Sequence, residues 1–114
     1  MGKKMNELNI QYTNEQIEKI RDHGFIYICA CPSQVSEQIA NLRRLFKYQR
    51  NCITSGEALL DLKTHEIIAE ATNRAHDIMQ QCLHDILIHE NWDLDTLNMP
   101  PNLRELLEKS LLKN

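Results

Sequence analysis

One long helical pattern, over residues 64–89, constrains the fold of this chain more than any other feature. Its apolar residues recur every three or four positions and therefore fall on one face of a helix. They are Ile67, Ile68, Ala71, Ala75, Ile78, Met79, Cys82 and Ile86. The opposite face carries polar residues, which include Glu66, Glu70, Asn73, Asp77 and His84. The pattern predicts an amphipathic helix with Thr64 as its N-cap and with its polar face in solvent.

A second long helix is predicted over residues 33–53. Pro32 suits the first turn of a helix, where its missing N–H is not needed, and Cys31 or Ser33 can supply the cap. One arc of this helix is apolar and consists of Val35, Ile39, Leu42, Leu45, Phe46, Cys52 and Ile53. Beside this arc lies a basic stripe, which we define as Arg43, Arg44, Lys47 and Arg50. The pattern predicts a helix with one apolar side and one row of exposed cations.

Shorter helical patterns lie on either side of these two. Thr13 and Gln16 form a capping-box pattern, which predicts a short helix over about residues 14–23. Leucines predict a short helical turn over residues 57–63 and a final helix over about residues 103–112.

Together these elements predict an all-α fold, a small helical bundle of about four to five helices built on the two long amphipathic ones. Residues 13–114 form a single α-helical domain, and residues 1–12 precede it as a flexible N-terminal segment. Three glycines in 114 residues disfavour a β-rich fold. Residues 25–31 are rich in apolar side chains, but no second strand is predicted to pair with them, so we interpret them as a buried helical or irregular segment.

Charge and motif content narrow the classes of function. Thirteen lysines and arginines against sixteen acidic residues give a net charge of −3, which disfavours generic nucleic-acid binding. No stretch approaches the roughly 18 apolar residues of a membrane span, and no secretion signal is recognised, so we expect a cytoplasmic protein that binds no membrane. Glycine-rich phosphate loops, nucleophile elbows and the His-Glu-x-x-His pattern are missing from the sequence, and we expect no enzymatic activity.

Cys29 and Cys31 form the clearest candidate for reactive chemistry. Cys31 precedes Pro32 at a predicted helix start, where backbone N–H groups and the helix dipole favour a thiolate. These two thiols, with Cys52 as a third participant, are candidates for a redox switch. Zinc or another thiol-bound metal is a further interpretation, which needs Cys52 or Cys82 together with a histidine from another helix. The simplest interpretation is that the cysteines pack as small apolar side chains and that no cofactor is bound.

The basic stripe is the second candidate site. A row of cations on an exposed helix face suits the acidic surface of a partner protein or, less well in an acidic chain, nucleic-acid phosphates. Apolar surface beyond what one small bundle covers also predicts a homodimer. The leading hypothesis is a small cytoplasmic interaction or regulatory protein that acts through a helical surface. The alternatives are a thiol-dependent redox or metal-binding protein centred on Cys29 and Cys31, and a nucleic-acid-binding regulator.

Overall fold

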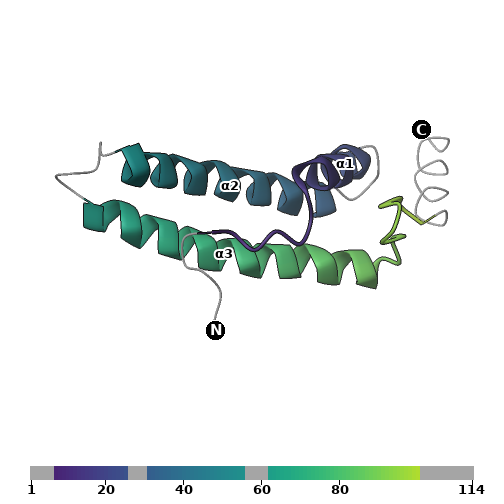
Figure 1. Cartoon of the computed structure of the whole chain (residues 1–114). Coiled ribbons are helices and arrows are strands. Elements are labelled where there is room, and N and C mark those ends of the chain that lie inside the picture. The colour runs from purple at the N-terminus through teal and green to yellow at the C-terminus, as the bar shows by residue number, and fades with distance from the viewer. Residues whose placement is uncertain (1–6, 26–30, 56–61, 101–114) are drawn as a thin grey trace.

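A computed structural model describes residues 7–25, 31–55 and 62–100 of the chain. These ranges contain three helices, which are α1 (Asn14–Phe25), α2 (Cys31–Ser55) and α3 (Leu62–His89). The long helices α2 and α3 run antiparallel as a hairpin, and α1 packs beside the N-terminal half of α2 (Figure 1). The predicted all-α fold class is confirmed for these residues.

The helix count and some helix bounds differ from the prediction. The described residues form three helices where the sequence predicted four to five. One reason is that α3 begins at Leu62, so the end of the turn predicted over residues 57–63 is part of the long helix. Thr64 consequently lies inside the first turn of α3, and its assignment as N-cap is wrong. The rest of that turn and the helix predicted over residues 103–112 lie outside the described residues.

The start of α1 follows the prediction. The Gln16 N–H donates to Thr13 Oγ1 at 3.1 Å, and the Thr13 N–H donates to Gln16 Oε1 at 2.8 Å, so the capping box is confirmed. Ile17 and Ile20 follow one and two turns later and are buried, with 3% and 0% of their surface exposed. A local sequence signal therefore fixes where α1 begins and which of its residues enter the core.

The hydrophobic core lies where α1, α2 and the C-terminal half of α3 meet. Its buried members are Tyr12, Ile17, Ile20, Ile39, Leu83, Leu87, Trp92, Leu97 and Met99. α3 ends in a Schellman motif, in which Asn91 has a φ of 63° and the Trp92 N–H donates to the Leu87 carbonyl at 2.9 Å. This turn directs the following residues back over the end of the bundle, where they cover the core.

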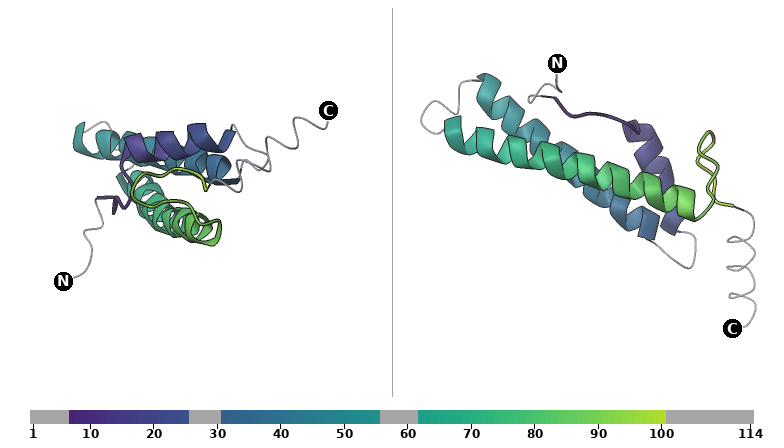
Figure 2. Two further views of the ribbon diagram at one scale, coloured as in Figure 1. Left: turned by 90° about the vertical axis from the view of Figure 1, so that its right-hand side faces the viewer. Right: turned by 90° about the horizontal axis from the view of Figure 1, so that it is seen from below.

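An extended segment, residues 7–12, leads into α1 and lies along α3 (Figures 1 and 2). We call this segment the strap. These residues belong to the segment 1–12 that was predicted to be flexible, yet in the structure Tyr12 of the strap is buried in the core. The strap is therefore part of the packed structure.

The buried face of α3 is not the one that the apolar pattern predicted. Its buried residues are Ala69, Thr72, Asn73, His76, Gln80, Leu83 and Leu87. Ile67 and Ile78, assigned to the apolar face, are 56% and 68% exposed, whereas Asn73, assigned to the solvated face, is buried. The physical reason is that the buried polar side chains have hydrogen-bond partners in the strap and in α2, so their burial is not penalised.

The two faces of α3 should respond differently to truncation. Leu83→Ala should lower the free energy of unfolding by about 2–5 kcal/mol, because it leaves a cavity in the core. Ile67→Ala is the matched control on the exposed face and should change it by less than about 1 kcal/mol. Urea unfolding followed by circular dichroism measures both values, and equal losses would contradict this assignment of the buried face.

Candidate functional site

The side-chain amide of Gln80 holds the middle of the strap by its main chain. Gln80 Nε2 donates to the Asn9 carbonyl at 2.6 Å. Gln80 Oε1 accepts from the Gln11 N–H at 2.8 Å and from the Tyr12 N–H at 3.2 Å. One buried amide therefore satisfies three main-chain groups of an extended segment that has no strand beside it to pair with among the described residues.

Asn73 and His84 fix the two ends of the strap. Asn73 Nδ2 donates to the Glu7 carbonyl at 2.9 Å. At the other end the Tyr12 hydroxyl and His84 Nδ1 are joined by a hydrogen bond of 2.6 Å. Burial raises the pKa of the Tyr12 phenol, so the neutral form is favoured in the folded chain. These contacts run along α3 at intervals of about one to two turns, which matches the extended course of the strap.

Arg43, on α2, joins the strap, α1 and α3. Its Nε donates to His76 Nε2 at 2.9 Å, and its Nη1 donates to Asn14 Oδ1 at 2.7 Å. Its Nη2 donates to the Tyr12 carbonyl at 2.7 Å and to Gln80 Oε1 at 2.9 Å. Arg43 was predicted to be exposed, but it is half-buried, and this burial lowers the pKa of its guanidinium. All four acceptors are neutral.

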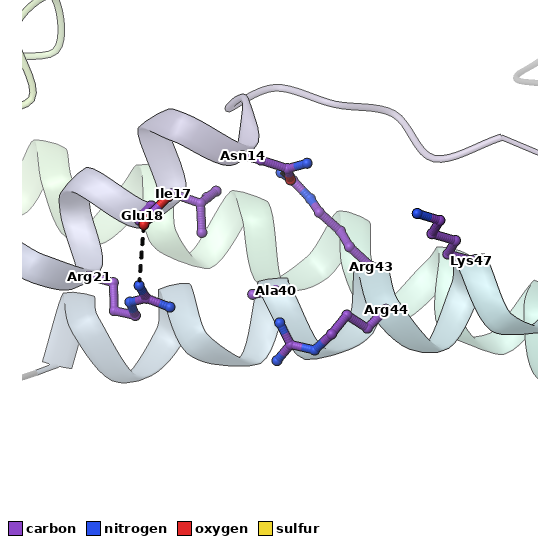
Figure 3. A pocket seen from close by; sticks show the side chains of 8 residues that line it. All are labelled: Asn14, Ile17, Glu18, Arg21, Ala40, Arg43, Arg44 and Lys47. Carbon is purple, nitrogen blue, oxygen red and sulfur yellow. Dashed lines mark hydrogen bonds and ion pairs between the residues drawn. The ribbon is translucent and has the colours of Figure 1, made fainter.

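A groove between α1 and α2, with a volume of about 390 Å³, opens beside Arg43 (Figure 3). It is lined by Asn14, Ile17, Glu18, Arg21, Ala40, Arg43, Arg44 and Lys47, and we call it the basic groove. Its one carboxylate, on Glu18, lies 3.8 Å from Arg21 Nη2 in an ion pair. Arg21 also pairs with Asp22 and Glu37 just outside the groove, so within the described part of the chain the cations of the groove without an ion pair are Arg43, Arg44 and Lys47.

Three of the four residues of the predicted basic stripe meet in this groove. Arg43, Arg44 and Lys47 line it, whereas Arg50, about one turn beyond Lys47 on α2, does not. Arg44 is hydrogen-bonded to the neighbouring Asn41, and Lys47 is exposed. Among the described residues, the ion pairs all belong to Arg21 on the α1 side of the groove, so no carboxylate is paired with Arg43, Arg44 or Lys47.

The candidate thiols do not form one site in the described part of the chain. Cys31 is exposed at the first residue of α2, and Cys52 is buried near its end. The helix between them spans roughly 32 Å, which is too far for a shared ligand or a disulfide. Cys29 lies outside the described residues. Within the described ranges, no group of three or more His, Cys, Asp or Glu side chains is placed to hold a metal ion.

Asn73 and Gln80, which bind the main chain of the strap from α3, were not identified as binding residues from the sequence. They belong to a row with alternating spacings of four and three, which consists of Ala69, Asn73, His76, Gln80, Leu83 and Leu87. This heptad spacing is the signal that could have identified the buried face. Because half of the row is polar, a search for apolar periodicity alone does not detect it.

Comparisons with protein-family models, curated proteins and solved structures found no match to this chain. Across the residues that the structure describes, no helix is both long enough and apolar enough to cross a membrane.

Tyr12→Phe should alter how stability depends on alkaline pH. The folded chain keeps the Tyr12 proton at a pH where the unfolded chain, with a tyrosine pKa of about 10, releases it. This contribution to stability is present below about pH 10 and is lost as the pH rises through the raised pKa. The free energy of unfolding, measured by urea denaturation from about pH 9 to 11, should therefore fall more steeply for the wild type than for Tyr12→Phe.

At neutral pH the same variant should be less stable by about 0.5–1.5 kcal/mol, because it loses the hydrogen bond to His84. Tyr48→Phe is the matched control, since the Tyr48 side chain is 62% exposed, and it should keep the wild-type slope. Identical alkaline slopes for the wild type and Tyr12→Phe would show that the phenol is not protected by the fold.

Proposed function

We propose that this chain is a small helical interaction protein that binds an acidic segment of a partner protein in the basic groove. The observation that supports this proposal is the environment of Arg43. Its guanidinium is half-buried, and its four hydrogen-bond acceptors are all neutral. A partly buried charge without a counter-charge is unfavourable, and an anion in the adjoining groove relieves that cost.

The donors of the groove suit a carboxylate. A guanidinium has five N–H groups, and four hydrogen bonds from Arg43 end on acceptors among the described residues. The remaining N–H, on Nη1, has no acceptor in that part of the chain. Arg44 and Lys47 add cations on the same wall. A carboxylate among these groups accepts charge-assisted hydrogen bonds, which are roughly twice as strong as neutral ones.

The charge distribution favours an acidic protein segment over a nucleic acid. The groove carries an excess of cations, whereas the chain as a whole is acidic. A long polyanion would meet repulsion wherever it extends beyond the groove. A short run of aspartate or glutamate side chains places its charges in the groove alone, and exposed complementary charges of this kind raise the rate of association as well as the specificity.

Reversing the exposed charges of the groove should weaken this binding. The variant Arg44→Glu/Lys47→Glu should bind a fluorescein-labelled peptide of eight glutamates at least tenfold more weakly than the wild type in fluorescence anisotropy at about 50 mM salt. Lys63→Glu/Arg74→Glu is the control, because it makes the same change in net charge at two exposed positions of α3 away from the groove. The control should bind nearly as the wild type does.

Equal losses in the two double variants would contradict the proposal, since binding would then follow net charge. A single-stranded oligonucleotide with eight phosphates is the second probe. If the oligonucleotide binds more tightly than the peptide and depends on the same two residues, the chain acts as a nucleic-acid-binding regulator instead.

The buried row of α3 described above is its first seam, and we also propose that two copies of the chain associate through a second seam on the same helix. The second seam consists of Ile68, Ala71, Ala75, Ile78 and Cys82, and its spacing alternates between three and four, as in a coiled coil. All five side chains are exposed or half-buried. In an antiparallel pair centred on Ala75, Ile78 of one copy lies beside Ala71 of the other and Ile68 lies beside Cys82. Large side chains thus meet small ones across a two-fold axis.

Ile78→Glu should shift the equilibrium from dimer to monomer, because it places a charge in the centre of the second seam. Ile88→Glu is the matched control, since Ile88 is 51% exposed on the same helix but lies outside the seam. Sedimentation equilibrium over a series of protein concentrations measures both variants. A wild type that is monomeric at every concentration, or equal dissociation in the two variants, would overturn the dimer proposal.

A further inference from the structure

The strap occupies a site that recognises it by its main chain. We define the strap site as Arg43, Asn73, Gln80 and His84. We infer that the strap site is a binding site for an extended peptide segment that carries a tyrosine, and that the strap of this chain is its resident occupant. This inference goes beyond the proposed function, because the peptide is held on α3 and needs no acidic side chain.

Five hydrogen bonds join three side chains of the strap site to main-chain atoms of the strap. The strap side chains contribute little to this recognition, since Glu7, Asn9, Ile10 and Gln11 are exposed. Any extended peptide presents the same carbonyl and N–H groups at the same spacing. The strap site is therefore tolerant of sequence at these positions, as in other modes of recognition that pair with a peptide main chain.

Tyr12 supplies the one side-chain anchor. Its ring is buried in the core with 6% of its surface exposed, and its hydroxyl is hydrogen-bonded to His84 Nδ1 at 2.6 Å. A single buried aromatic anchor beside a series of main-chain hydrogen bonds is a frequent arrangement in peptide recognition. A competing peptide consequently needs a tyrosine at the position that corresponds to Tyr12.

Release of the strap leaves the helices packed. α1 keeps its capping box and its buried residues Ile17 and Ile20, so only Tyr12 has to leave the core. Asn73 and Gln80 then exchange strap partners for water, which costs less than leaving them buried and unpaired. Because the strap is joined directly to α1, it competes with an added peptide at a high effective concentration. The apparent association constant of the peptide is the intrinsic constant multiplied by the fraction of chains whose strap site is open.

The test weakens the strap in the full chain and offers the same sequence as a separate peptide. Gln11→Pro removes the N–H that donates to Gln80, at a residue whose side chain is exposed. Ile10→Ala is the matched control, because it changes an exposed side chain and leaves every main-chain group in place. The probe is a fluorescein-labelled peptide with the sequence of residues 7–13, and binding is measured by anisotropy.

Gln11→Pro should bind the probe about three- to tenfold more tightly than the wild type, because the loss of one hydrogen bond raises the open fraction by that factor. Ile10→Ala should bind it as the wild type does. Tyr12→Ala is a second variant with a weakened strap, used if circular dichroism shows that Gln11→Pro is unfolded. A folded variant of either kind that shows no saturable binding would overturn the inference.

Changes in the peptide separate main-chain recognition from other causes of binding. A probe N-methylated at the residue equivalent to Gln11 should bind severalfold more weakly, and a probe with alanine in place of tyrosine should lose binding. A probe with alanine at the positions of Asn9, Ile10 and Gln11 should bind as the native sequence does. Equal affinity of the methylated and native probes would also overturn the inference. Arg44→Glu/Lys47→Glu should leave binding of this probe unchanged, which separates the strap site from the basic groove.

Discussion

A buried side-chain amide must have hydrogen-bond partners, and this requirement at Gln80 determines how the strap, α2 and α3 fit together. Gln80 is 2% exposed, and its two polar atoms make four hydrogen bonds, three with the strap and one with Arg43. Since a buried amide without partners costs about 1–3 kcal/mol, neither the strap nor α2 can be displaced from Gln80 without that cost unless water enters. The polar contacts of this one residue thus add to the apolar core in positioning the strap and α2 against α3.

Arg43 extends the same network to the basic groove. Its guanidinium reaches α3 through His76, the strap through the Tyr12 carbonyl and the start of α1 through Asn14. The strap site and the basic groove therefore share one cation. A ligand that moves this guanidinium changes the hydrogen bonds that hold the strap, and by thermodynamic linkage a change at the strap alters affinity in the groove by the same factor.

The parts of the structure that were predicted from sequence are those that depend on near neighbours. The capping box joins Thr13 to Gln16, three residues apart, and both long helices were recognised from periodicities within a few turns. The buried face of α3 was assigned wrongly because Asn73 and Gln80 bind strap groups 66 to 71 positions away and His76 binds Arg43, 33 positions away. The predicted exposure of Arg43 was wrong for the same reason, because the acceptors that bury it come from three other segments. The exposure of Lys47 depends on few distant contacts and was anticipated correctly.

The exposed apolar face of α3 follows from the way its polar face is used. A hairpin of two long helices can cover only one side of each helix, and α1 packs on α2. On α3 the side toward the strap is occupied through hydrogen bonds, which leaves Ile78 and its neighbours in solvent. Burial of an apolar row at heptad spacing removes it from water, and a second helix with the same spacing is a surface that can bury it. The same polar contacts that hold the strap thus leave α3 with a surface suited to a second helix.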